Sequence, residues 1–224
     1  MRGVAVIAVA GLLAAVAPGC GGGGHAATTA PAPGPDPFAG DPVAALGGLE
    51  ARLLAADHVT ITAQVSASGA ARAELDGTIE IARATGASIA LEGTFDGTAI
   101  ATRWDSTAAA AVDTGPPVWA DGLVIGVTRM GVLHNWAKVI GGADPDTGNG
   151  DIRDWVGTDE PTWLHDDPAS RTLAFHVVFG GAPIGEVELT LDDRGLPARR
   201  VQVVHFPEGD MRVLEEYVRF DVRP

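Results

Sequence analysis

Four segments near the end of the chain alternate between apolar and polar residues, and this alternation constrains the fold more than any other feature. They are Arg171–Phe179, Gly185–Leu191, Arg200–Phe206 and Arg212–Val222. A strict period of two is the pattern of a β-strand with one apolar and one polar face. The joints between them, at 180–183, 192–197 and 207–210, are rich in residues that tolerate turns. The sequence therefore predicts an antiparallel meander.

The alternation also predicts which side chains share the apolar face of this meander. Phe175, Leu189 and Val203 are expected on one common face, with Arg200 and Gln202 on the other. The apolar positions, segment by segment, are Leu173, Phe175, Val177 and Phe179; Val187, Leu189 and Leu191; Val201 and Val203; and Leu214, Val218, Phe220 and Val222. An apolar sheet face has to be covered, so another part of the chain, or a ligand, is expected to lie against it.

The N-terminus is typical of a secretory signal followed by a lipid-attachment site. The apolar run at 4–17 follows a single charged side chain and is short for a membrane span. It leads into APGC at 17–20, which resembles the lipobox of bacterial lipoproteins, whose cysteine is lipidated. Ordinary signal cleavage beside a free thiol is the alternative. We expect a signal peptide at 1–19, lipidated Cys20 with a Gly/Pro-rich tether at 20–40, and one folded domain at 41–224.

Between the tether and the meander, the chain predicts a helix, a first set of strands and a second helix. Asp41-Pro42 is a favourable helix start, because aspartate caps and proline suits the first helical position. Segments with a period of two follow at 58–66, 71–83, 87–95 and 98–105. The segment Ala120–Ile140 predicts one helix that is apolar on nearly every side. Such a helix has two apolar neighbours: the sheet, and either the N-terminal helix or a ligand.

Composition and motifs narrow the function. The formal net charge of −14 would repel phosphate backbones, so we expect no nucleic-acid partner. The acidic loop 144–151 departs from the EF-hand pattern at the positions of Gly148, Asn149 and Trp155. The histidines are scattered, and the sequence contains neither a Gly-x-Ser-x-Gly elbow nor a phosphate-binding glycine loop. We expect no catalysis, no metal and no cofactor.

The order of elements from Asp41 to Val222 resembles the LolA/LolB/LppX superfamily of bacterial lipoprotein and lipid carriers. The run GEVELTLDDRGLPARRVQVVHFPEGDMRVLEEYVRF, from Gly185 to Phe220, is similar to the C-terminal strands of LolA-like proteins. The resemblance implies an α+β fold, in which an antiparallel half-barrel sheet has an N-terminal helix and an inserted helical lid over its concave apolar face. Carriers of this superfamily often have Phe-Arg-Trp on an early strand, and that arginine latches the lid. The matching strand here, at 87–93, has no arginine.

These observations predict an envelope lipoprotein that binds acyl chains of lipids or lipoproteins, as a carrier or a receptor. We expect a monomer on the periplasmic side, held to a membrane through Cys20, with the outer membrane favoured. The alternative is a non-carrier interaction protein or envelope sensor on the same scaffold. The residues expected to line the cavity are Ile61, Val65, Ile79, Ile81, Ile89, Leu91, Phe95, Trp104, Leu123, Val127, Met130, Phe175, Leu189 and Val203.

Overall fold

The computed structural model describes residues 40–106, 118–145, 152–164 and 171–224. The first part holds α1 (Pro42–Leu54), β1 (His58–Gly69), β2 (Ala73–Ala82), β3 (Gly86–Phe95) and β4 (Thr98–Asp105). The middle holds α3 (Val118–Met130), α4 (Val132–Ile140), the 3-10 turn η1 (Ile152–Asp154) and β5 (Val156–Trp163). The last part holds β6 (Thr172–Phe179), β7 (Ala182–Leu191), β8 (Pro197–Phe206) and β9 (Gly209–Arg223). Cys20, the signal peptide, the tether up to residue 39 and most of the loop 144–151 lie outside the described residues.

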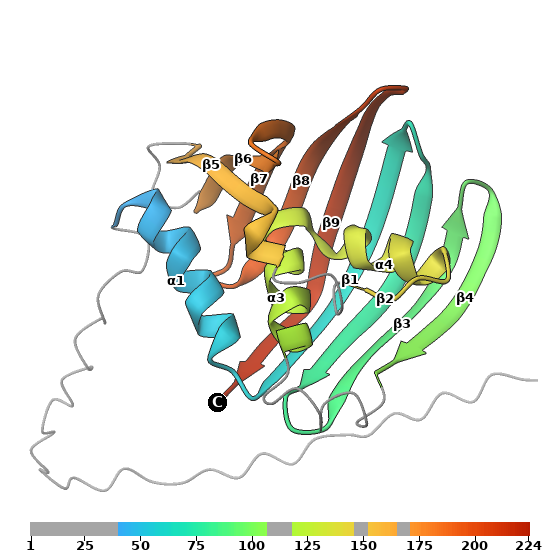
Figure 1. Cartoon of the computed structure of the whole chain (residues 1–224), viewed down its shortest axis with the longest axis horizontal. Helices are drawn as coiled ribbons and strands as arrows, with labels where there is room; N and C mark the ends of the chain where they lie inside the picture. Colours follow the sequence, from blue (N-terminus) through green and yellow to red (C-terminus); the bar gives the residue numbers. More distant parts are fainter. Residues whose placement is uncertain (1–39, 107–117, 146–151, 165–170) are drawn as a thin grey trace, which may run out of the picture. The chain divides into compact units, whose positions relative to one another are not determined.

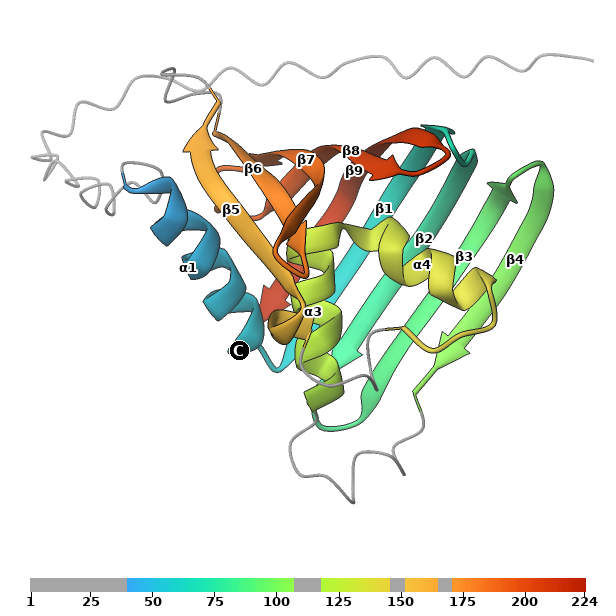
Figure 2. The same ribbon diagram turned by 45° about the horizontal axis from the view of Figure 1, so that its top comes forward.

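The strands form one nine-stranded antiparallel sheet in the order β4-β3-β2-β1-β9-β8-β7-β6-β5. Two meanders, β1–β4 and β5–β9, are joined where the first and last strands of the sequence pair with each other. The sheet curves, and α3 and α4 lie against its concave side (Figures 1 and 2). The predicted α+β fold, an open antiparallel sheet with helices over its apolar face, is therefore confirmed, as is the antiparallel meander of the last four strands.

The N-terminal helix begins where the sequence predicts. The Asp41 side chain accepts a hydrogen bond from the Val43 N–H, and Pro42 occupies the first turn. Three leucines, Leu46, Leu49 and Leu53, are buried on the face of α1 that packs against β5 and α3. Their spacing of three and four residues places them on one side of the helix.

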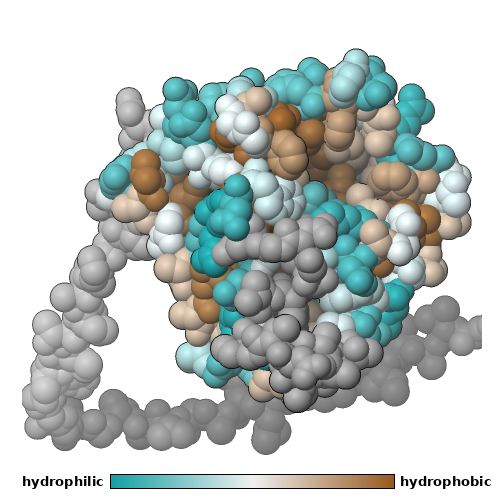
Figure 3. All heavy atoms as spheres, viewed as in Figure 1, coloured by the Kyte–Doolittle hydropathy of each residue, from teal (hydrophilic) through white to brown (hydrophobic). Residues whose placement is uncertain are grey.

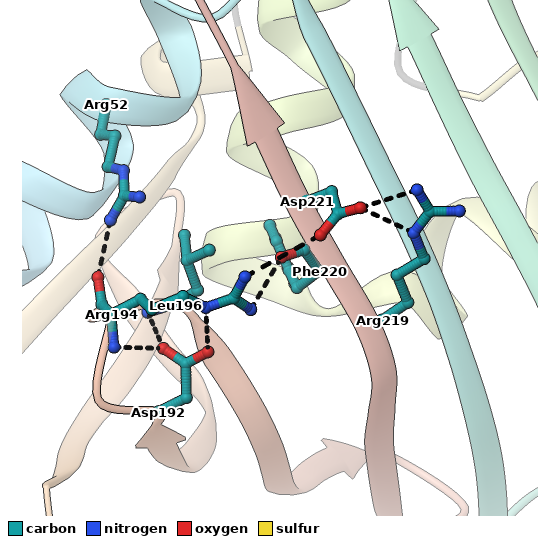
Figure 4. A network of polar contacts seen from close by, with 7 residues as sticks. All are labelled: Arg52, Asp192, Arg194, Leu196, Arg219, Phe220 and Asp221. Carbon is teal, nitrogen blue, oxygen red and sulfur yellow. Dashed lines mark hydrogen bonds and ion pairs between the residues drawn. The ribbon is translucent and has the colours of Figure 1, made fainter. Parts of the chain in front are cut away.

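A network of polar contacts attaches α1 to the turn between β7 and β8 and to the end of β9 (Figure 4). Arg52 of α1 donates a 2.7 Å hydrogen bond to the Arg194 carbonyl, and Asp192 accepts from the backbone N–H groups of Arg194 and Leu196. The Arg194 guanidinium then donates to the Phe220 carbonyl. The turn predicted at 192–197 therefore also positions the N-terminal helix.

The segment predicted as one helix is two helices that meet at Gly131. Gly131 has φ +84° and ψ +171°, a backbone conformation that residues other than glycine rarely adopt. The break follows Met130, so α3 and α4 can pack on different parts of the protein. The first of these helices, α3, contacts α1, η1 and β5, whereas α4 contacts β3 and β4.

The face assigned to β8 from the sequence is wrong. Val203 pairs with Glu186 and lies on the outer face of the sheet, away from Phe175 and Leu189. Arg200, paired with Leu189, turns toward the core instead and is fully buried. The reason is that this buried arginine hydrogen-bonds to the end of α3 on the concave side, a contact that the alternation of apolar and polar residues does not reveal.

In β9, a bulge changes which residues face inward. The pairing with β1 shifts between Thr62 and Ala63, so that Val218 has no partner and is 67% exposed. Glu215 and Tyr217 before the bulge, and Phe220 after it, are buried. The expectation that Val218 shares the apolar face with Phe220 is therefore wrong, because one extra residue reverses the alternation.

The strand β5 was not predicted from the sequence. It forms one edge of the sheet, beside β6, and its register shifts between Asp159 and Thr162. Glu160 in this irregular stretch has φ +50°, and Pro161 cannot donate to a ladder. Because the alternation is interrupted at the bulge, the sequence of this segment does not have the pattern of a strand.

Candidate functional site

The concave face of the sheet is largely filled by the protein's own side chains. Leu123 and Ile125 of α3 and Trp136 of α4 are fully buried against it. They join one continuous apolar core with the inward residues of β1, β2 and β3. Among the described residues the helices therefore leave no large open half-barrel cavity, and a ligand has to bind in the space that they do not cover.

An apolar pocket of about 460 Å³ lies beside α4, at the end of the face where β8 turns into β9. In Figure 3 brown, hydrophobic residues surround a hollow above α4. Such a volume is within the range of roughly 300–1,000 Å³ typical of small-molecule sites. The lining residues are Ala71, Phe95, Met130, Leu133, His134, Ala137, Lys138, Ile184, Gln202, Val204, Phe206, Met211 and Val213.

One wall of the pocket comes from α4 and from Met130, the last residue of α3. Leu133, His134, Ala137 and Lys138 are spaced by three and four residues along α4, so they form one face of that helix. The opposite wall comes from the β8–β9 hairpin, where Phe206 is 43% exposed and so leaves apolar surface at the rim. The pocket thus lies between a helix face and a strand end, both mainly apolar.

Few polar side chains reach this pocket. Gln202 points inward from β8, but its Oε1 accepts hydrogen bonds from the Arg200 guanidinium at 3.0 and 3.1 Å. Lys138, half-buried on α4, places its ammonium group 5.9 Å from the centroid of the Trp155 ring. Trp155 in turn packs edge-on against Phe179, with ring centroids 5.7 Å apart.

Two buried charged residues hold the junction between α3 and α4. Arg200 donates to the carbonyls of Thr128 and Arg129, at 2.9 and 2.6 Å, near the C-terminal end of α3. Glu215 accepts from the Leu133 N–H, at 3.1 Å, in the first turn of α4. Helix ends leave such carbonyls and N–H groups without partners inside the helix, so each charge satisfies one helix end.

The environment of this junction shifts two pKa values. Burial lowers the pKa of Arg200, and the nearby Glu215 and Tyr217 oppose that shift. Burial, together with the Glu215 carboxylate, raises the pKa of Tyr217 well above its usual value. Tyr217 therefore remains protonated, and its hydroxyl donates a 2.5 Å hydrogen bond to Glu215.

Further ion pairs hold α3 to α1 and to the β2–β3 turn. Arg129 makes a bidentate contact with Glu50, at 2.8 and 2.9 Å, and both side chains are mostly buried. Arg83 donates to Asp121 in the first turn of α3 and to the Ala56 carbonyl just after α1. These contacts make α3 a fixed element, whereas α4 carries the exposed face that lines the pocket.

The structure distributes the predicted cavity residues over four environments. Phe95 and Met130 line the pocket. Val203 lies on the outer face, as described above. Trp104 is half-buried against the core and donates a hydrogen bond to Asp144. The remaining predicted residues are buried in the core: Ile61, Val65, Ile79, Ile81, Ile89, Leu91, Leu123, Val127, Phe175 and Leu189. Whether any of them meets a ligand stays a prediction.

Most of the pocket lining was missed from the sequence. The α4 positions could have been found, because the residues at 133, 134, 137 and 138 follow helical spacing. Val204 and Phe206 could not, because the predicted face of β8 was inverted, and Met211 of β9 precedes the segment predicted at 212–222. Ile184 lies between the turn predicted at 180–183 and the strand predicted from Gly185, and was assigned to neither.

A second hollow, of about 440 Å³, lies over the outer face of β5–β9 and differs in chemistry. Its lining includes the charged groups of Glu160, Glu186, Glu188 and Arg212, together with His176. The His176 Nδ1 lies 3.9 Å from the Glu160 carboxylate. Within the described ranges, no group of three or more His, Cys, Asp or Glu side chains is arranged to hold a metal ion. This hollow is less suited than the first to an apolar ligand.

Comparisons with known proteins return structural likenesses only. No family model matches the chain, and no curated protein matches its sequence. Among solved structures, it is similar to a LolA superfamily protein from Nitrosomonas europaea, with 8% identity and a TM-score of 0.27 over 81% of this chain and 93% of that one. It is also similar to a beta-barrel-like protein, of a domain of unknown function, from Brucella abortus, with 9% identity and a TM-score of 0.28 over 75% and 98% of the chains. At these values neither likeness says anything about function.

Among the helices of the described residues, none has the length and hydropathy needed to cross a membrane.

Proposed function

We propose that this protein is a lipid-anchored envelope protein that holds an acyl chain of a lipid or lipoprotein in the pocket beside α4, without catalysis. The single observation that carries the proposal is an apolar pocket left open on a face that is otherwise filled. Each methylene transferred from water to such a site gains about 0.8 kcal/mol, before the cost of binding. An acyl chain bound there would be carried by, or presented from, a protein attached to the membrane at Cys20.

Filling the pocket tests this proposal directly. The protein would be purified without detergent and examined by native mass spectrometry for bound lipid, and then titrated with a fluorescent fatty acid. Ala137→Trp places an indole in the pocket and should weaken probe binding about tenfold or more, because it displaces the ligand. Ala51→Trp, on the exposed side of α1, makes the same change on a helix far from the lining residues and should not alter binding. Equal binding by both variants and the wild type would contradict the proposal.

The anchor requires a separate experiment. Cys20→Ala should move the protein from the membrane fraction to the soluble fraction of cells, because no acyl chain can then be attached. Two or more acyl chains give stable attachment, whereas one does not. A Cys20→Ala protein that still sediments with membranes would refute the anchor and leave the pocket untouched.

A second function is supported by the filling of the concave face. Leu123, Ile125 and Trp136 occupy the space that a carrier would need for large ligands. The ion pairs of Arg129 and Arg83 also fix α3 in place. An interaction or sensor protein on the same scaffold needs no ligand, so the absence of both co-purified lipid and probe binding would favour this function.

A further inference from the structure

The pocket differs in charge from the rest of this acidic protein. The formal net charge of the chain is −14, with 29 Asp and Glu residues. Even so, no carboxylate belongs to the described residues that line the pocket. Its ionisable side chains are His134 and Lys138, one turn apart on α4, and Lys138 is the single lysine of the sequence. The pocket is therefore a place where an anion escapes the repulsion that it meets elsewhere on the protein.

Lys138 is positioned where a head group would lie. Its side chain is half-buried, the residue lines the pocket, and its ammonium group lies 5.9 Å from the Trp155 ring centroid. Trp155 and Phe179 form an aromatic wall next to it. Lysine side chains commonly bury their methylenes along apolar surface and keep the charge near water. A ligand with its chain in the pocket and an anion at this boundary would match both parts of the side chain.

The size of the pocket limits the number of acyl chains. A water molecule occupies roughly 30 Å³, so a pocket of about 460 Å³ holds roughly 15 groups of that size. A methylene is of similar size, so one long acyl chain fills the space. Two or three chains would require Leu133 and its neighbours in the core to move, and Leu133 is tied to Glu215 through its backbone.

We propose that the ligand is a single-chain amphiphile with an anionic head group, and that Lys138 binds this head group. This inference rests on the proposed function. A fatty acid, with its carboxylate, and a lysophospholipid, with its phosphate, share the required chemistry, which is a single acyl chain and one anionic group.

Ligands with the same chain and different head groups test the proposal. Purified, delipidated protein would be titrated with palmitate, 1-palmitoyl-lysophosphatidylglycerol, hexadecanol and dipalmitoyl phosphatidylglycerol. At least one of the two single-chain anions should bind about tenfold or more tightly than hexadecanol, because an ionic hydrogen bond is added. Comparison of the affinities for palmitate and for the lysophospholipid then distinguishes the two sources of the anion. Equal affinity for hexadecanol, or tighter binding of the two-chain lipid than of either single-chain anion, would overturn the inference.

Substitutions at Lys138 separate this inference from the proposed function. Lys138→Met should reduce the preference for the anion over hexadecanol to about one, and Lys138→Arg should retain it. Arg103→Met removes a cation that is 60% exposed on β4, changes the net charge equally, and should keep the preference. An unchanged preference in Lys138→Met would refute the role of Lys138 while acyl binding stands. Failure of the wild type to bind any of the four ligands would refute the proposed function itself.

Discussion

Arg200 and Glu215 are direct neighbours across β8 and β9, yet each binds a different one of the two helices that cover the sheet. Arg200 satisfies carbonyls at the end of α3, and Glu215 satisfies an N–H at the start of α4. The sign of each charge matches the helix end that it meets. One pair of opposite residues on the sheet thereby fixes the position of the break between the helices, and with it the face of α4 that lines the pocket.

Arg200→Met should destabilise the protein strongly. The substitution retains much of the volume but removes the donors to the carbonyls of Thr128 and Arg129. A buried polar group without a partner costs about 1–3 kcal/mol, so we expect the free energy of unfolding to fall by about 2 kcal/mol or more. Urea unfolding followed by circular dichroism would measure it. Arg103→Met, an exposed arginine on β4, is the matched control and should leave the midpoint near that of the wild type. A midpoint for Arg200→Met equal to that of the control would show that the helix ends do not depend on Arg200.

Gly131→Ala tests the contact between the helix junction and Glu215. A Cβ atom at Gly131 would lie 2.4 Å from the Glu215 Oε1, and its backbone conformation disfavours a side chain. Gly142 also has positive φ, +73°, but a Cβ there meets nothing within 4 Å. Gly142→Ala should cost about 1–2 kcal/mol from the backbone alone. Gly131→Ala should cost more, because its conformation of φ +84° and ψ +171° is essentially restricted to glycine and because the carboxylate must also move. Equal losses in the two variants, measured by thermal unfolding, would mean that Glu215 yields without cost.

The strands could be predicted from the sequence, but not all of their faces. The strands of both meanders were predictable, because apolar residues recur with a period of two on a half-buried sheet. The faces of β8 and β9 were not, because Arg200, Gln202 and Glu215 are polar residues on the buried side. Arg200 and Glu215 face inward and satisfy helix ends that are distant in sequence, and Gln202 accepts hydrogen bonds from Arg200. A local pattern of hydropathy contains no information about such partners, and it therefore placed Val203 in the core.

The pocket illustrates the same limit. The apolar character of the concave face could be predicted from the strands, but which part stays uncovered depends on where α3 stops. That point is set by Gly131 and by the charges that it meets, so residues such as Ile79 and Ile89 became core while Phe206 and Met211 line the opening.

His205 should titrate above its ordinary pKa. A hydrogen bond to the Asp210 carboxylate, 2.9 Å from its Nδ1, raises the pKa of this imidazole above 6.5. Because the folded value is raised, the pair stabilises the β8–β9 hairpin fully below about pH 6.5, and this contribution is lost as the pH rises through the raised value. Titration of the imidazole signals by NMR would measure the shift. Asp210→Asn should return the pKa toward its ordinary value, and an unchanged titration in that variant would exclude Asp210 as the cause.

Gly77→Ala should disturb the docking of α4 on the sheet. A Cβ atom at Gly77 of β2 would lie 2.8 Å from Cζ2 of Trp136 and 2.9 Å from the Ala90 carbonyl. Alanine within a strand is ordinarily more favourable than glycine by roughly 0.5–1 kcal/mol. Here we expect the opposite sign, a loss of about 1–3 kcal/mol, because the core is overpacked and Trp136 is fully buried.

Gly157 of β5 supplies the control for this substitution. A Cβ there would meet Val178 at 3.8 Å, an ordinary contact, so Gly157→Ala should be neutral or mildly stabilising.

If Trp136 is the main obstacle, the double variant Gly77→Ala/Trp136→Phe should lose less stability than the sum of the single changes, because the shorter ring leaves room for the methyl group. Additive losses would assign the clash to the Ala90 carbonyl instead. The fluorescent fatty-acid titration on Gly77→Ala then reports whether moving α4 also changes the pocket; weaker binding is expected, since Leu133 and Ala137 lie on the same helix.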